Sequence, residues 1–183
     1  MAIIFIIIIR YMATMEYYNS IANGYNELYK QEQLAKLNPI FNYLSENNKL
    51  PGESDLILDV GCGTGVTGEV FSNRIIGIDP SLELLKQANE TKAMHGNCIQ
   101  AMAEHLPFQD VYFTLTIALT SVQNFEDINR GLDEIGRVSR GMIVISVPLK
   151  SPKLEEIQRL IGLKFKIIKT LKEDKDLIFF LIN

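Results

Sequence analysis

The sequence predicts an α/β fold in which helices cover both faces of a mostly parallel β-sheet. From residue 54 onward, short apolar runs alternate with stretches of helical periodicity, an order typical of strand–helix–strand units. Two of these runs, Leu56–Leu58 and Met142–Ile145, are apolar without a break, as central strands buried on both faces must be. A chain of 183 residues is long enough to bury the core of one such domain.

The first 50 residues stand outside this alternation. Residues 1–14 are an apolar extension, and its isoleucine run is shorter than the roughly 20 residues that a membrane helix needs. We interpret it as a mis-assigned start, with Met12 or Met15 as the first residue, or else as an extra strand or docked helix. Residues 15–50 are predicted to form a helical cap, because apolar side chains recur there every three or four positions. Residues 51–183 are predicted to form the ligand-binding domain.

The elements of this domain follow from the order of apolar runs and turns. Strands are predicted near residues 55–60, 74–79, 96–101, 112–118 and 141–148. Helices are predicted near residues 65–72, 81–90, 127–138 and 152–161. Two further apolar runs flank a polar turn at Lys172–Asp176, which predicts a closing hairpin and therefore one antiparallel strand.

Composition restricts the classes of partner. With 47% apolar and 22% charged residues and a net charge of -4, the chain is typical of globular proteins and disfavours a nucleic-acid footprint over the whole surface. A nucleic-acid contact is expected only through the basic segment 150–172, whose simpler interpretation is a solvated face. Cys62 and Cys98 suit a reducing, cytoplasmic location, and neither has the spacing of a metal site, so no metal is predicted.

The most specific feature is the segment from Asp59 to Gly65, which has the pattern Asp-x-Gly-x-Gly-x-Gly and continues the first apolar run. Asp79 ends the second run, so an acid lies at the tip of the next strand. A glycine turn lets backbone approach a ligand closely, and such a carboxylate can accept hydrogen bonds from ribose hydroxyls. The pattern predicts a nucleoside site. Val66 stands where a dinucleotide fingerprint needs Gly or Ala, and no lysine follows Gly65 as a phosphate-cradling loop requires.

Four segments in the right order resemble the class I S-adenosylmethionine-dependent methyltransferases. They are Asp59–Gly65, Gly77–Asp79, Ala103–Phe108 with the pattern Ala-Glu-x-Leu-Pro-Phe, and Glu134–Val138. The chain is similar to this family over most of residues 54–183. The resemblance implies a Rossmann-like sheet of seven strands in the order 3-2-1-4-5-7-6, mostly parallel with the last strand antiparallel. It also implies S-adenosyl-L-methionine as cofactor and an unidentified methyl acceptor as second substrate.

The resemblance further implies the residues of the cofactor site. The glycine turn would meet the methionine end, Asp59 would organise the ammonium group, and Asp79 would bind the ribose, with a plain helix cap as the alternative for Asp79. The predicted cofactor-binding residues are Tyr18, Asp59, Gly61, Cys62, Gly63, Gly65, Asp79, Pro80, Met102, Ala103, Glu104 and Ala118. Tyr18 and Tyr25 resemble the aromatic entry helix that folds over the cofactor, with core packing as the alternative.

Gln123 and Asn124 follow the fourth strand and are predicted to orient the substrate, with a capped loop as the alternative. Neither can act as a base at neutral pH, and no catalytic residue is predicted. Met102 and Thr114 depart from the family, which often has acids at these positions. A thioether is a weak acceptor, so Glu104 or Gln100 would have to accept from the adenine amino group.

The predicted function is methyl transfer from S-adenosyl-L-methionine, with a small-molecule acceptor favoured. A tRNA or protein acceptor is one alternative. A second is a catalytically silent subunit that binds the cofactor and stabilises a partner, an interpretation that the missing acids at Met102 and Thr114 keep open. A nicotinamide-dependent oxidoreductase is the third and is disfavoured by the glycine spacing.

Overall fold

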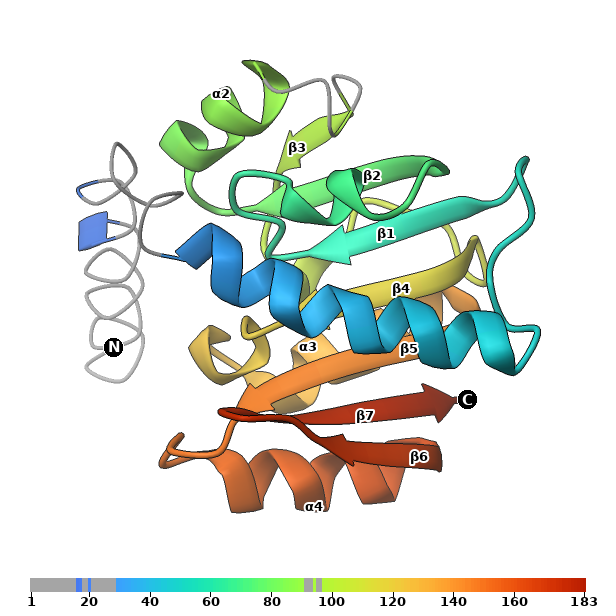
Figure 1. Cartoon of the computed structure of the whole chain (residues 1–183). Coiled ribbons are helices and arrows are strands. Elements are labelled where there is room, and N and C mark those ends of the chain that lie inside the picture. The colour runs from blue at the N-terminus through green and yellow to red at the C-terminus, as the bar shows by residue number, and fades with distance from the viewer. Residues whose placement is uncertain (1–15, 18–19, 21–28, 91–93, 95–96) are drawn as a thin grey trace.

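The computed structural model describes residues 16–17, 20, 29–90, 94 and 97–183, and these form a seven-stranded sheet (Figure 1). The strands lie in the order β3-β2-β1-β4-β5-β7-β6. β7 is antiparallel to both β5 and β6, and the other pairings are parallel. The strands are β1 (Leu56–Val60), β2 (Arg74–Asp79), β3 (Cys98–Gln100), β4 (Phe113–Leu119), β5 (Ser139–Pro148), β6 (Lys166–Lys172) and β7 (Asp176–Ile182). The predicted fold, strand order and closing hairpin are confirmed.

The predicted helices form with one exception. The helices are α2 (Leu82–Glu90), α3 (Ile128–Val138), α4 (Leu154–Lys164) and a helix over residues 29–46. The helix predicted over 65–72 is wrong: only the single 3-10 turn η1 (Val66–Glu69) forms. Gly65, with φ 79°, begins that turn from the left-handed region, and Gly68 inside it weakens helix propagation. The predicted apolar extension 1–14, Tyr18 and Tyr25 lie outside the described residues.

Helices pack on both faces of the sheet, as Figure 1 shows. On one face the helix 29–46 buries Leu37, Ile40 and Leu44 together with side chains of α2. On the other face α3 and α4 pack against strand residues such as Leu58 and Ile145. Neighbouring residues along a strand point to opposite faces, so the uninterrupted apolar runs of β1 and β5 supply both cores. The helix 29–46 therefore shares the core of the sheet.

Arg137 fixes the loop between β3 and β4. Its guanidinium donates to the carbonyl oxygens of Leu106 and Phe108 at 3.0 and 2.7 Å and forms an ion pair with Asp110. The Glu134 carboxylate binds the same guanidinium and accepts from the Leu106 N–H at 2.9 Å. These hydrogen bonds satisfy loop backbone groups that have no strand partner, and thereby hold the chain just after residues 102–104.

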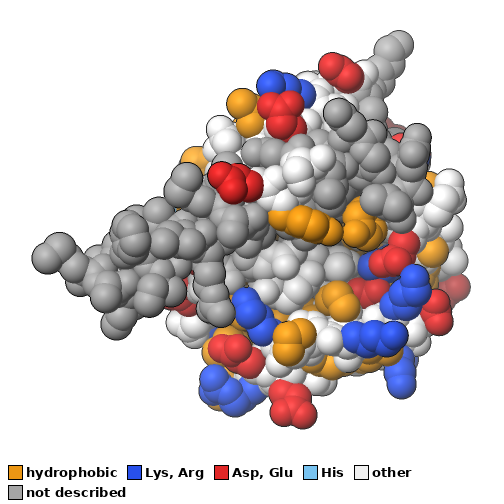
Figure 2. All heavy atoms as spheres, turned by 90° about the vertical axis from the view of Figure 1, so that its left-hand side faces the viewer, with side chains coloured by type: hydrophobic (Ala, Val, Ile, Leu, Met, Phe, Trp, Pro, Cys, Tyr) orange, Lys and Arg blue, Asp and Glu red, His pale blue; other side chains and the backbone are white. Residues whose placement is uncertain are grey.

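The edge strand β6 carries three lysines of the basic segment 150–172. Its side chains are largely exposed, and its first and last residues are Lys166 and Lys172. In Figure 2, basic, acidic and apolar side chains are mixed over the lower part of the visible face, with no continuous patch of one sign. Lysines along an edge strand oppose pairing with another sheet, a structural reason for this composition. Among the described residues, no helix combines the length and apolar character needed to cross a membrane.

Two glycines give opposite predictions for stability. A Cβ on Gly141 in β5 would lie 2.1 Å from the Thr114 carbonyl oxygen, whereas a Cβ on Gly162 in α4 would meet nothing within 4 Å. We expect Gly141→Ala to destabilise the protein by more than about 1 kcal/mol through overpacking. Gly162→Ala should stabilise it by roughly 0.5–1 kcal/mol, because alanine loses less entropy in a helix. Urea unfolding of both variants tests the packing; a destabilised Gly162→Ala would contradict it.

Candidate functional site

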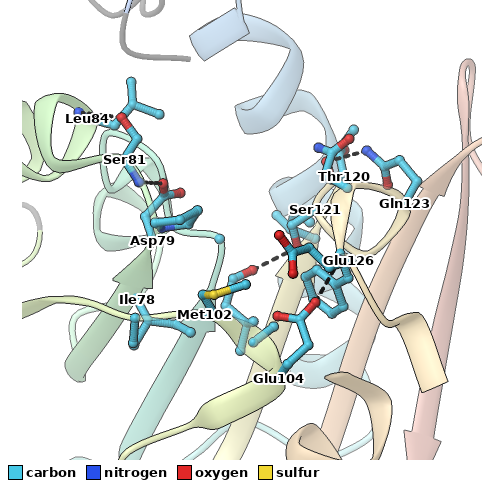
Figure 3. Close-up of a pocket in the computed structure, with 18 of the residues that line it drawn as sticks. Ile78, Asp79, Ser81, Leu84, Met102, Glu104, Thr120, Ser121, Gln123 and Glu126 are labelled. Carbon is cyan, nitrogen blue, oxygen red and sulfur yellow. Dashed lines mark hydrogen bonds between the residues drawn. The ribbon is translucent and has the colours of Figure 1, made fainter. Parts of the chain in front are cut away.

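A cavity of about 340 Å³ opens at the carboxyl ends of β1, β2 and β4 (Figure 3). The connection after β1 leads to β2, and the connection after β4 leads to β5 on the other side of the sheet order. The two connections therefore diverge between β1 and β4 and leave a crevice at the strand ends. The cavity is lined by Val60, Gly61, Ile78, Asp79, Pro80, Ser81, Leu84, Ala101, Met102, Ala103, Glu104, Leu119, Thr120, Ser121, Gln123, Asn124, Phe125, Glu126 and Lys153. A volume of this size is in the range of small-molecule sites.

Asp79 forms the wall at the tip of β2. Its carboxylate accepts from the backbone N–H of Ser81 at 2.8 Å and of Gly63 at 3.0 Å, and only 7% of the residue is exposed. The first bond holds the start of α2, and the second holds the glycine turn beside the strand tip. Asp79 is thus a helix-start acceptor and a lining residue of the cavity at once.

The glycine turn brings two strand ends together. Gly61 has φ 76°, and a Cβ there would lie 2.5 Å from Cβ of Ser121. The Ser121 hydroxyl donates to the Val60 carbonyl at 2.8 Å, which ties the end of β4 to the end of β1. Of the turn's glycines only Gly61 lines the cavity. Gly65 instead makes room for Met94, since a Cβ would lie 2.3 Å from its Cγ.

Residues 102–104 form the wall beyond β3. Met102 and Ala103 line the cavity, and η3 (Ala103–His105) turns Glu104 inward, where it is 5% exposed. The Glu104 Oε1 accepts from the N–H groups of Glu126 and Asp127 at 2.7 and 3.2 Å, so this carboxylate also holds the chain before α3. Gln100 does not line the cavity; its amide donates to the Pro80 carbonyl at 3.0 Å.

The opposite side is built from η4 (Val122–Asn124) and the start of α4. Figure 3 places Thr120 and Gln123 across the cavity from Asp79. Gln123 Nε2 donates to the Thr120 carbonyl at 2.5 Å, and Lys153 Nζ donates to the Gln123 carbonyl at 2.7 Å. Thr120 has φ 53°, unusual for a β-branched residue, and its N–H donates to the Ser146 hydroxyl at 3.0 Å.

The structure brings together eight of the predicted site residues at the cavity. These are Gly61, Asp79, Pro80, Met102, Ala103, Glu104, Gln123 and Asn124. Asp59, Cys62, Gly63, Gly65 and Ala118 do not line it. Ala118 is fully buried in the core on the face of α3, because the alternation of side chains along β4 points it to that face of the sheet. Asp59 is 3% exposed, and its carboxylate is hydrogen-bonded to Thr67.

Sequence reasoning missed five polar lining residues: Ser81, Thr120, Ser121, Glu126 and Lys153. Thr120 and Ser121 directly follow a predicted strand, a position that signals the cavity edge. Glu126 and Lys153 carry no such signal, because they enter the cavity from segments that only the tertiary fold brings near it. Thr114, one departure from the family, lies at the opposite end of β4 and binds Arg140 at 2.7 Å. Its identity therefore has no bearing on the cavity.

Burial raises the pKa of Asp79 to about 6, although the hydrogen bonds from Ser81 and Gly63 lower it. Burial likewise raises the pKa of Asp59 to about 7, although the hydrogen bond with Thr67 lowers it. Burial, followed by the charge of Glu104, also raises the pKa of Glu126 above its ordinary value. The cavity thus concentrates acids, while Lys153 is the one lysine or arginine among its lining residues within the described chain. No three potential metal ligands cluster within the part of the chain that the structure describes.

These pKa values predict that the ligand-free protein loses stability as pH rises from 5 to 7. In this range the folded state holds protons on Asp59 and Asp79 that the unfolded state, with pKa 3.8, has released. Each group then contributes a decrease of up to about 1.4 kcal/mol per pH unit until pH passes its folded pKa. Asp59→Asn should flatten this decrease, which urea unfolding at pH 5, 6, 7 and 8 measures; equal slopes in both proteins would contradict the assignment.

Residues 58–145 match the sequence model of a family described as a methyltransferase domain. An uncharacterised protein of Methanocaldococcus jannaschii is 32% identical over 142 residues, covering 74% of this chain and 52% of that protein. The malonyl-[acyl-carrier protein] O-methyltransferase of Hamiltonella defensa is 32% identical over 105 residues, covering 55% of this chain and 40% of that enzyme. The chain spans about half the length of these curated relatives.

Solved structures support the same assignment through the fold. The magnesium protoporphyrin IX methyltransferase of Synechocystis, solved with bound S-adenosylmethionine, superposes with a TM-score of 0.74 at 16% identity. The match covers 95% of this chain and 97% of that one. The sequence match and the shared strand order agree over the domain that carries the cavity. The chain therefore carries a methyltransferase domain over residues 58–145 and shares the fold of a solved S-adenosylmethionine-bound methyltransferase.

Proposed function

We propose that the protein transfers a methyl group from S-adenosyl-L-methionine to a small-molecule acceptor. The observation that carries this proposal is the cavity between Gly61, Asp79 and residues 102–104, which offers a close backbone approach, a buried carboxylate and an apolar wall in one place. This set fits the parts of the cofactor. Asp79 is suited to the ribose diol, Ile78 and Met102 are suited to the adenine faces, and Gly61 leaves room for the methionine end.

The charge of the cavity favours a cationic ligand. Asp79, Glu104 and Glu126 line it against one lysine. S-adenosylmethionine carries a sulfonium and an ammonium against a single carboxylate, so its net charge is complementary to this lining. A helix start gives the cofactor's carboxylate little help here, because η1 is a single turn and has only a small dipole. Asp59, remote from the cavity surface, is suited to organise the turn rather than to touch the cofactor.

The protein's contribution to the reaction is alignment in a dry site. The cofactor supplies an electrophilic methyl group, which passes to the acceptor nucleophile while the sulfur keeps its bonding pair and becomes a thioether. Positioning of the two reactants is worth roughly 7–11 kcal/mol of barrier in well-oriented reactions. Gln123 lies across the cavity from Asp79 (Figure 3) and Asn124 lines the same cavity, so both are suited to orient an acceptor. We assign no general base.

The size and lining of the cavity favour a small acceptor. Relatives at about 30% identity include demethylmenaquinone methyltransferase of Thermobifida fusca, and also the bovine 18S rRNA (guanine-N(7))-methyltransferase. On the face seen in Figure 2 the charges are mixed and offer an RNA acceptor no broad basic surface. We keep a cytoplasmic location as part of the proposal, in line with the reduced cysteines.

Incubation with methyl-labelled S-adenosylmethionine and separate pools of metabolites, tRNA and protein tests the proposal. We expect label in the metabolite pool only. Calorimetric binding of S-adenosylhomocysteine without transfer to any pool would favour the silent-subunit alternative. Failure to bind the cofactor or its product at millimolar concentration would refute the proposed function.

A further inference from the structure

Two cysteine thiols meet beneath the glycine turn, although 36 positions separate them in the sequence. Cys62 lies within the turn, and its N–H donates to the Ile78 carbonyl at 2.9 Å. A Cβ on Gly77 would lie 2.7 Å from the Cys62 sulfur, so the missing side chain at Gly77 leaves the space that this sulfur fills. Cys98 is the register partner of Gly77 on β3, and it packs against the same core as Cys62. The two thiols are free and close enough to shift each other's pKa, and the Cys62 thiol donates to the Gly63 carbonyl oxygen with the sulfur at 3.9 Å.

The environments of the two sulfurs differ in a way that assigns them separate roles. Cys98 is half-buried, and the interaction with the Cys62 thiol lowers the pKa of its thiol below the ordinary 9.0. Cys62 is 7% exposed, and the same interaction, followed by burial, raises the pKa of its thiol well above that value. The thiolate is the reactive form of cysteine, so Cys98 is the better nucleophile and Cys62 the protected partner.

We propose that Cys62 and Cys98 are an oxidative modification site that forms a reversible disulfide under the glycine turn. The oxidant is a peroxide. The Cys98 thiolate attacks one peroxide oxygen, the O–O bond breaks, and water leaves after protonation, which produces a sulfenic acid. The Cys62 sulfur then attacks the Cys98 sulfur, and the hydroxyl leaves with the Cys62 proton as a second water. Overall two thiols and one peroxide give one disulfide and two waters, and an external thiol reverses the change.

The expected consequence of oxidation is weaker cofactor binding, and this part rests on the proposed function. A disulfide requires an S–S distance of about 2.05 Å, shorter than any contact between unbonded sulfurs. Closing the bond draws Cys62 toward β3, and Cys62 lies between Gly61, which lines the cavity, and Gly63, which donates to Asp79 at 3.0 Å. Tightly packed interiors transmit such a displacement, so the turn and the Asp79 carboxylate shift together.

Hydrogen peroxide treatment of the purified full chain tests the proposal. We expect a mass lower by two hydrogen atoms, one peptide linking Cys62 to Cys98 in a non-reducing digest, and reversal by dithiothreitol. Calorimetry with S-adenosylhomocysteine should give at least tenfold weaker affinity after oxidation and full recovery after reduction. Cys98→Ser is the control, since its single buried thiol has no partner and its affinity should survive the same treatment. Cys98→Ala repeats this control should serine disturb β3.

Other results of the peroxide experiment would contradict one part of the proposal each. Higher oxidation states alone, or disulfides between two chains, would overturn the modification site. An intramolecular disulfide with unchanged affinity would overturn its effect on binding, and a loss of affinity in oxidised Cys98→Ser would show that the effect does not come from the disulfide. If the reduced protein does not bind S-adenosylhomocysteine, the proposed function fails, whereas the disulfide is still decided by the mass and the linked peptide.

Discussion

Lys36→Met is expected to destabilise the protein by about 3–5 kcal/mol, because it leaves the buried Asp176 carboxylate without its cation. Lys36 Nζ lies 2.9 Å from Asp176 and 2.8 Å from the Thr120 hydroxyl, and the two residues of the ion pair are only 4% and 1% exposed. Glu32, one turn earlier on the helix 29–46, accepts from the same ammonium at 3.0 Å. The ion pair therefore joins this helix to β7 and to the Thr120 end of β4.

Urea unfolding measures this effect. The double variant Lys36→Met/Asp176→Asn should lose less stability than Lys36→Met alone, because it no longer buries a net charge. Lys86→Met is the matched control, since its partner Glu83 is exposed and such a pair contributes little. A loss below about 1 kcal/mol for Lys36→Met, or a double variant that is less stable than both single variants, would contradict the buried ion pair.

Asp79→Asn is expected to weaken cofactor binding at least tenfold, or about 1.4 kcal/mol, while the ligand-free protein stays folded at pH 7.5. The asparagine oxygen can still accept from the Ser81 N–H, so the start of α2 keeps its partner, whereas the amide nitrogen cannot accept from the Gly63 N–H. Burial raises the pKa of Asp79 to about 6, so its ionised form costs stability above that pH. The substitution removes this cost together with the charge that the cofactor's cationic groups and ribose diol would meet.

Calorimetry between pH 5.5 and 7.5 separates this role from a structural one. In the unaltered protein, affinity should rise with pH as Asp79 releases its proton, and binding should be accompanied by proton release. Both effects should diminish in Asp79→Asn. Glu83→Gln, which removes an exposed carboxylate of α2 outside the cavity, should change neither. Unchanged affinity in a folded Asp79→Asn would refute the assignment of Asp79 to the ribose.

The sheet was predictable because its signals are local. The apolar runs of β1 and β5 indicate buried strands without reference to any distant residue. The polar turn before β7 marks the closing hairpin in the same local way. The stretch after Gly65 was mispredicted because its apolar pattern was given more weight than Gly68, which weakens a helix there. Phe71, only 2% exposed, packs into the core just after the single turn η1.

The cavity was predictable only where it borders a strand end. Asp79 and Gly61 carry their signal in the neighbouring residues, whereas Glu126 and Lys153 are ordinary charged residues in any local window. The same holds for Cys98, which gains significance from its contact with Cys62 across Gly77. Contacts of this kind depend on strand order, and strand order places together segments that are far apart in the chain.

The sequence by itself determined the strand–helix alternation, the glycine turn and the acid after the second strand, since each depends on spacing within about 20 residues. The tertiary structure alone decided which side chains line the cavity, which carboxylates are buried enough to hold protons near neutral pH, and that Lys36 and Asp176 form a buried pair. The physical reason is that burial and electrostatic environment are properties of the packed whole, to which residues distant in the chain contribute as much as neighbours do.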